Sequence, residues 1–129
     1  FVRTDFPGGW SSDSMNKFTM NGRNTREEDI WKYIAKLADF RKKSSALTTG
    51  KMMQYSPKEG EYVFFRYNKN QTVMTVLNTA KEKKIISIKN YPERTNGFST
   101  MKNIITGEVT NLEDFSIDAK GSGVWELQK

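Results

Sequence analysis

The sequence predicts a mainly β fold, an antiparallel β-sandwich preceded by one α-helix. Three observations predict it: a helical apolar period over residues 25–44, a change to short alternating segments after Gly50, and turn signals between those segments. The 129 residues are enough for one hydrophobic core, and 12% aromatic residues are typical of a folded chain. We therefore expect a single core.

The helix is expected to begin at a capping box and to run to about Ser44. Thr25 and Glu28 fit this box, in which the hydroxyl accepts from the third helical amide and the carboxylate reaches back. The apolar arc that follows is wider than one packing surface needs. We therefore expect contact with two neighbours, one of them outside this chain. The apolar residues at helical spacing are Ile30, Trp31, Tyr33, Ile34, Leu37, Ala38 and Phe40.

About seven strands are expected after the helix, separated by residues typical of turns. Aromatic residues fall on both faces of the segment 61–67, which predicts an interior strand covered on both sides, with helix 25–44 able to cover one face. The expected strands are 51–56, 61–67, 72–78, 82–90, 101–106, 115–119 and 123–127. The turn signals lie at 57–60, 68–70, 95–97 and 121–123.

The composition excludes several kinds of chemistry. The chain has no cysteine and no histidine, which removes disulfides, thiolate nucleophiles, cysteine-ligated zinc and the commonest general base. Any catalysis would have to rely on Asp, Glu, Lys or Tyr. The net charge of +6 is spread along the chain without a basic arm, so we expect no nucleic-acid partner. No apolar run is long enough to span a bilayer, so we expect no membrane partner.

Residues 1–24 are expected to form a long loop, because they are rich in Gly, Asn, Ser and Thr and show no sustained period. Loops of this length are uncommon inside a compact domain. The chain also begins with Phe1 rather than Met. We therefore expect a piece of a longer protein. The compartment stays open, and the parent protein could equally be exported or periplasmic.

The order of several motifs resembles one known family. Residues 2–10, Val-Arg-Thr-Asp-Phe-Pro-Gly-Gly-Trp, and the helix ending at residues 36–47 resemble the end of the catalytic barrel in neopullulanase-like and cyclomaltodextrinase-like enzymes of the alpha-amylase family, glycoside hydrolase family 13. Segments 50–55, 62–67 and 73–78 resemble the start of its carboxy-terminal domain C, and segments 103–109 and 124–127 its final strands. The first motif is the most specific, because Pro7 fixes φ while Gly8 and Gly9 permit a tight turn.

The resemblance implies a Greek-key β-sandwich of the alpha-amylase domain C type, preceded by the last helix of a truncated (β/α)8 barrel. Residues 1–24 would be a loop from the barrel, 25–47 the last helix and its connector, and 48–129 the sandwich. The parent would hydrolyse α-glucosidic bonds in starch, pullulan or cyclodextrins by a retaining mechanism, with carboxylates on earlier barrel strands. None of those positions lies in this chain, so we expect no catalytic residue here, and no cofactor or metal ligand.

The leading hypothesis is a non-catalytic domain whose partner is the upstream barrel of the same polypeptide. The isolated chain would then expose part of helix 25–44 or hide it by self-association. The alternative is an accessory module that binds malto-oligosaccharide. Its candidate residues are the tyrosines Tyr55, Tyr67 and Tyr91. Arg3, Asp5 and Trp10 would belong to a substrate-facing loop at the rim of the barrel, but a packed structural turn is the favoured interpretation for them. A third hypothesis, an enzyme in its own right, is disfavoured because no two carboxylates form a recognisable arrangement.

Overall fold

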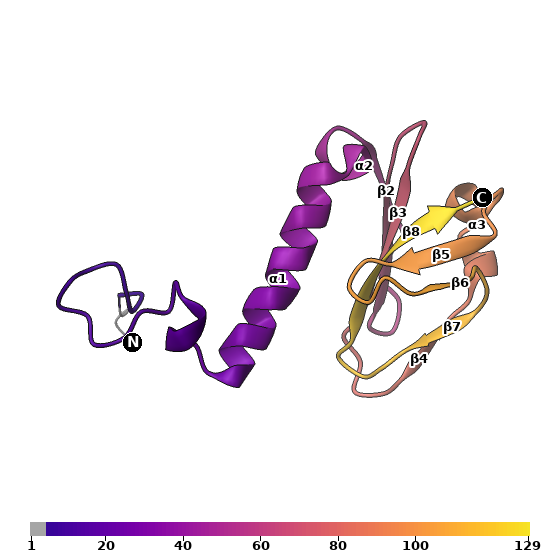
Figure 1. Ribbon diagram of the computed structural model, residues 1–129. Coiled ribbons are helices and arrows are strands. Elements are labelled where there is room, and N and C mark those ends of the chain that lie inside the picture. The colour runs from indigo at the N-terminus through magenta and orange to yellow at the C-terminus, as the bar shows by residue number, and fades with distance from the viewer. Residues whose placement is uncertain (1–4) are drawn as a thin grey trace. The chain divides into compact units, whose positions relative to one another are not determined.

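The computed structural model describes residues 5–129, so Arg3 of the loop motif lies outside the described residues. The chain divides into two compact units, Phe1–Lys36 and Leu37–Lys129, and helix α1 (Thr25–Lys43) runs from the first into the second. Figure 1 shows the order of the elements along the chain. Within the described part of the chain, no helix has both the length and the apolar character needed to cross a bilayer.

The first unit consists of an irregular loop, the short 3-10 turn η1 (Met20–Gly22) and the first part of α1. The helix begins where the sequence predicts, but the capping box lies one residue earlier than expected. The Asn24 side chain accepts from the Glu27 amide at 2.9 Å, and the Glu27 carboxylate accepts from the Asn24 amide at 2.9 Å. Thr25 and Glu28 do not form the box, because Glu28 is engaged by Arg23 and Lys32.

The helix ends at Lys43, and a second short helix, α2 (Ser45–Thr48), follows in the region expected to be a connector. Ser44 caps α2 by accepting from the Leu47 amide at 3.3 Å. The side-chain oxygen of Gln71 accepts from the Ser44 hydroxyl at 2.7 Å and from the Ala46 amide at 3.1 Å. Because Ser44 and Ala46 are both buried, the entry to the β unit is firmly anchored.

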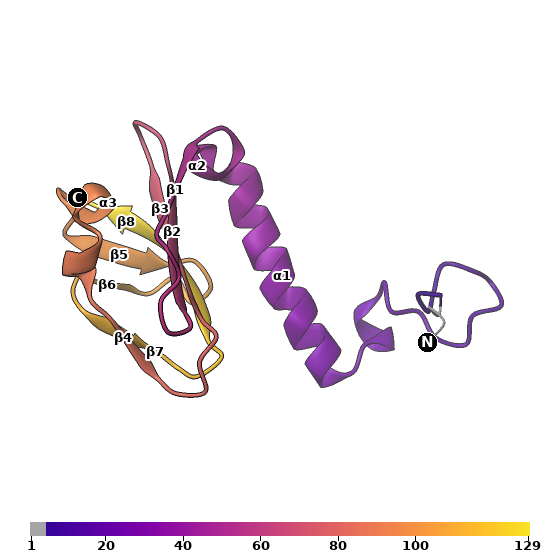
Figure 2. The ribbon, with the colours of Figure 1, turned by 180° about the vertical axis from the view of Figure 1, so that it is seen from behind.

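The second unit is an antiparallel β-sandwich, which confirms the predicted fold class. Its larger sheet has six strands in the order β1-β2-β3-β8-β5-β6, and its smaller sheet pairs β4 with β7. Both ribbon views show the small sheet beside the large one (Figures 1 and 2). The strands are β1 (Lys51–Gln54), β2 (Glu61–Tyr67), β3 (Thr72–Asn78), β4 (Lys84–Ile86), β5 (Thr100–Asn103), β6 (Val109–Asn111), β7 (Phe115–Ile117) and β8 (Ser122–Gln128).

Two parts of the sandwich differ most from the sequence prediction, and the strands expected at 101–106 and 115–119 also end earlier, at Asn103 and Ile117. The strand expected at 82–90 is only three residues long and is followed by η2 (Ile88–Asn90) and α3 (Pro92–Thr95). The Asp114 carboxylate accepts from the Ser87 hydroxyl at 2.7 Å and from the Ile88 amide at 2.9 Å, which ends the strand, and Pro92 has the φ that a first helical turn needs. Strand β6 was not predicted, because its three residues are all exposed and carry no burial pattern.

The core lies between the two sheets. Strand β2 is an interior strand, as predicted, and Val63 and Phe65 on its core face are buried. Its opposite face, with Tyr62 and Phe64, is only partly buried. A Cβ on Gly123 would lie 2.1 Å from the Trp125 ring, so only glycine leaves room for this core indole. The core cluster is Val63, Phe65, Met74, Val76, Ile86, Tyr91, Met101, Ile117, Trp125 and Leu127.

Candidate functional site

The carboxylates of the described residues form no metal-binding cluster. Residues 5–129 contain no group of three or more Asp or Glu that could hold a metal ion. Glu59 and Glu61 flank the turn glycine Gly60, but Glu61 accepts a short hydrogen bond from the Tyr91 hydroxyl, whereas Glu59 is exposed and lies 3.7 Å from the Lys84 ammonium. These two carboxylates therefore serve different local contacts and do not converge on a common point.

The loop motif forms the tight turn that the sequence predicts. Gly8 and Gly9 both have positive φ, at 117° and 101°, which favours glycine. The Asp13 carboxylate closes the turn by accepting from the amides of Gly8 at 2.9 Å and Trp10 at 3.2 Å. The two candidate residues of this loop are both exposed, with Trp10 78% exposed and Asp5 solvent-facing. The turn thus presents the Trp10 indole outward.

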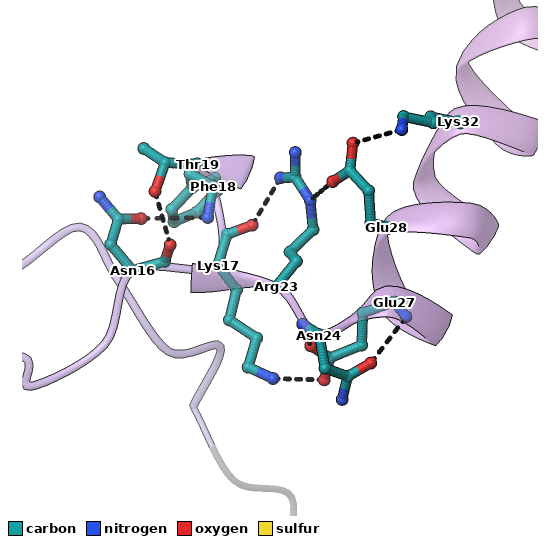
Figure 3. Close-up of polar contacts among 9 residues, drawn as sticks. All are labelled: Asn16, Lys17, Phe18, Thr19, Arg23, Asn24, Glu27, Glu28 and Lys32. Atoms are coloured by element: carbon teal, nitrogen blue, oxygen red, sulfur yellow. Dashed lines mark hydrogen bonds and ion pairs between the residues drawn. The ribbon is translucent and has the colours of Figure 1, made fainter. Parts of the chain in front are cut away.

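A polar network holds the end of the loop against the start of α1, and Figure 3 shows its residues. The Arg23 guanidinium donates to Glu28 at 2.6 Å and to the Lys17 carbonyl at 2.8 Å, and it lies 4.6 Å from the centre of the Trp31 ring. The Lys17 ammonium donates to Glu27. These hydrogen bonds, from Arg23 and Lys17 respectively, lower the pKa of Glu28 and of Glu27.

This network can fix the shape of the loop, and a hollow of about 270 Å³ lies beside it, lined in part by Arg23, Glu28 and Lys32. Sequence reasoning missed the roles of Lys17 and Arg23. The available signal was charge. The basic residues Lys17 and Arg23 precede a first helical turn that carries the acidic residues Glu27 and Glu28. The network therefore explains how a glycine-rich loop keeps one conformation without an apolar core of its own.

The structure brings Tyr55 and Tyr91 together but packs them into the sandwich. Their rings lie 4.8 Å apart, both contact Phe65, and Tyr91 is only 6% exposed. Burial, together with a hydrogen bond from the Tyr55 hydroxyl to Glu93 at 2.7 Å, raises the pKa of Tyr55 to about 12. Burial and the bond to Glu61 likewise raise the pKa of Tyr91. Tyr91 is thus a core residue, although it lines, together with Tyr55, a hollow of about 440 Å³.

Tyr67, the third candidate tyrosine, lies apart from this pair, under the guanidinium of Arg94. The guanidinium carbon of Arg94 is 3.9 Å from the ring centre of Tyr67, a distance typical of cation–π stacking. Arg94 follows Glu93 on α3, so this short helix connects Tyr55, through Glu93, with Tyr67, through Arg94. Sequence reasoning did not identify Arg94, because nothing in the local pattern reveals what a residue in a turn of helix will cover.

A polar groove of about 830 Å³ lies where the turn between β2 and β3, helix α3 and the end of β8 meet. Both ribbon views place α3 beside the last residues of β8 (Figures 1 and 2). The buried Nε of Arg94 has no hydrogen-bond acceptor within residues 5–129. We call this hollow the Arg94 groove. Its polar side chains include Asn70, Glu93, Arg94, Asn96, Glu126 and Gln128.

The second unit is thus an antiparallel β-sandwich of two sheets, and residues 5–129 hold no acidic cluster suited to a metal ion. Residues 52–126 match the family model described as the cyclo-malto-dextrinase C-terminal domain, and the chain belongs to this family.

Solved structures of alpha-amylases share the fold. An Anoxybacillus alpha-amylase has a TM-score of 0.68 at 17% identity, with 94% of this chain and 26% of that chain covered. The Geobacillus thermoleovorans alpha-amylase in complex with acarbose has a TM-score of 0.66 at 16% identity, with 95% and 27% covered. AmyP in complex with maltose has a TM-score of 0.71 at 16% identity, with 90% and 23% covered. The chain spans about a quarter of the length of these proteins.

Proposed function

We propose that this chain is the non-catalytic C-terminal part of an enzyme that hydrolyses α-glucosidic bonds in starch, pullulan or cyclodextrins, and that it stabilises the catalytic barrel that precedes it. One observation carries the proposal. The only buried residue among the 19 of α1 is the charged Glu28, whereas Ile30, Trp31 and Ile34 are 51%, 51% and 58% exposed. A helix with this distribution lacks an apolar neighbour.

The energy available at this helix is large enough for a domain joint. Fully burying a large apolar side chain contributes roughly 1.5 to 3 kcal/mol, and Ile30, Trp31 and Ile34 lie within two turns of one another. The Arg23–Glu28–Lys32 contacts lie beside these side chains and would keep the helix start polar at the edge of such a joint. The upstream barrel is the occupant that the family and the length of the similar structures favour.

A digestion assay tests the non-catalytic role. The purified chain should release no reducing sugar from starch, pullulan or cyclodextrin above a blank, because the proposal places the catalytic carboxylates on earlier strands of the barrel. Hydrolysis by the pure chain that persists after further purification would overturn the proposal.

Substitutions on α1 test the stabilising role. In the complete polypeptide, Ile34→Ser should lower the melting temperature of the barrel, because it removes an apolar contact of about 1.5 to 3 kcal/mol. Asp29→Ser, an exposed polar position on the same helix, is the matched control and should change it little. In the isolated chain, sedimentation should show self-association that Ile34→Ser weakens. Equal melting temperatures for all three proteins would contradict the proposed joint.

The second candidate function is an accessory module that binds malto-oligosaccharide. The observation that favours it is the Arg94 groove, because carbohydrate ligands need convergent donors and acceptors at an open surface. Of the candidate residues predicted from sequence, Tyr67 contacts this groove through Arg94 and Tyr55 contacts it through Glu93.

A further inference from the structure

We infer that the Arg94 groove is a binding site for a neutral oligosaccharide, with Arg94 as its central hydrogen-bond donor. This inference rests on the second candidate function and gives it a location. The groove lies within the β unit, and its volume of about 830 Å³ falls in the range of about 300 to 1,000 Å³ typical of ligand pockets.

Arg94 is held in place by a ring contact, and its Nε lacks a hydrogen-bond acceptor. Its guanidinium stacks on Tyr67, which fixes the plane of the five N–H donors, and the buried Nε has no acceptor among residues 5–129. Arg66 makes a useful contrast, because its buried Nε also lacks an acceptor, whereas its Nη2 donates to the carbonyls of Leu47 at 3.2 Å and Gly50 at 3.0 Å. Arg66 therefore anchors backbone carbonyls, whereas Arg94 is placed by its contact with Tyr67.

Acceptors line the same groove. One carboxylate oxygen of Glu126 accepts from the Gln71 side-chain amide at 2.5 Å, and one carboxylate oxygen of Glu93 accepts from the Tyr55 hydroxyl. Each carboxylate is therefore held in place, and its second oxygen can accept from a ligand. The amide side chains of Asn70, Asn96 and Gln128 form no hydrogen bond within the described part of the chain, and each supplies both a donor and an acceptor.

This mixture of donors and acceptors fits a ligand with many hydroxyl groups. A sugar hydroxyl donates one hydrogen bond and accepts others, so it can lie between a guanidinium and a carboxylate. Charges of both signs line the groove, with Lys69, Arg94 and Lys129 cationic and Glu93 and Glu126 anionic, so an anion would be attracted by the first three and repelled by the other two. The partly exposed Phe98 also lines the groove and offers a contact for the C–H face of a sugar ring.

The inference is tested by titrating the isotope-labelled 129-residue chain with maltotriose and following its backbone amide signals by NMR. We expect saturable shifts confined to residues 68–72, 93–98 and 126–128, with a Kd on the order of millimolar. Arg94→Ala should raise the Kd about tenfold, because it removes charged hydrogen bonds. Asn70→Ala should raise it severalfold without disturbing the fold, since this side chain has no partner in residues 5–129. Lys81→Ala, exposed and outside the groove, is the matched control.

Three results would overturn the inference: no shifts at tens of millimolar sugar, shifts centred outside the groove, or shifts at Arg94 with inorganic phosphate but not with maltotriose. The digestion assay and the melting temperatures report on the proposed structural role independently. A chain that stabilises the barrel but binds no sugar would therefore refute this site alone.

Discussion

The two units of this chain hold their shape by different means. The β unit has a continuous apolar core in which Phe65, Met74 and Val76 are fully buried. The described part of the first unit has no buried apolar side chain, and its order comes from polar contacts such as Arg23–Glu28 and Asp13 with the glycine turn. Large apolar residues there face outward instead, among them Phe6, Trp10, Met15, Phe18, Met20, Ile30, Trp31 and Ile34.

This difference indicates which unit is self-sufficient. Burial of apolar surface is the dominant stabilising term in folding, so the β unit can fold on its own. A unit that relies on exposed hydrogen bonds and ion pairs gains little from each of them. The first unit therefore has a defined local shape but limited stability, as expected of a segment that completes another domain.

The largest effect on the free energy of unfolding should come from replacing one phenylalanine by alanine in the β unit, compared with the same replacement in the first unit. Phe65→Ala should lower the free energy of unfolding of the β unit by about 3 to 5 kcal/mol, because it opens a cavity in a close-packed core. Phe18→Ala, at a side chain that is 64% exposed and whose ring pairs with that of Phe6, should change it by less than about 0.5 kcal/mol. Urea unfolding followed through buried Trp125 measures both. Equal losses would show that the units do not differ as described.

The same contrast explains how much of the fold was predictable. Strands β2 and β3 are rich in apolar and aromatic residues and are bounded by turn residues, and their bounds, 61–67 and 72–78, match the sequence prediction. Strand β6 is exposed on every residue and gave no signal. The capping box was placed on Thr25 rather than Asn24, because sequence alone could not show that Arg23 would engage Glu28.

The candidate site was less predictable than the fold. Tyr55 and Tyr91 were predicted as candidates from their residue type alone. The sequence could not show that their rings pack against each other and that Tyr91 is buried. The Arg94 groove is assembled from residues 68–72, 93–98 and 126–129, which are far apart in sequence. No local period can reveal a site that exists only after three segments meet.

A second prediction concerns alkaline pH and applies to the β unit alone. The pKa of Tyr55 in the folded chain is about 12 and that of Tyr91 is also raised, against about 10 in an unfolded chain. A raised pKa means that both phenols contribute stability that is fully present below pH 10 and is lost as the pH rises through their folded values. An alkaline titration followed by phenolate absorbance should therefore show two tyrosines that ionise at higher pH than the others. Their ionisation should coincide with unfolding of the β unit, seen as loss of the Trp125 fluorescence signal.

Tyr91→Phe sharpens this prediction. The variant should lose one of the two late phenolate steps, and it should be less stable at neutral pH because Glu61 loses its hydrogen-bond donor. The loop signals of Trp10 should not follow the alkaline step. A titration in which all tyrosines ionise together in the folded chain would contradict the burial of this pair.

The smallest effect should come from the helix cap and should be confined to the first unit. Asn24→Ala removes the side chain that accepts from the Glu27 amide, and loss of such a cap typically costs about 1 kcal/mol of helix stability. Thr25→Ala is the matched control, since the Thr25 side chain caps nothing within residues 5–129. Hydrogen exchange at the amides of residues 26–30 should accelerate in Asn24→Ala but not in Thr25→Ala, while the urea midpoint of the β unit stays unchanged. Faster exchange only in Thr25→Ala would restore the cap first predicted from the sequence, and a shifted urea midpoint would show that the two units are energetically coupled.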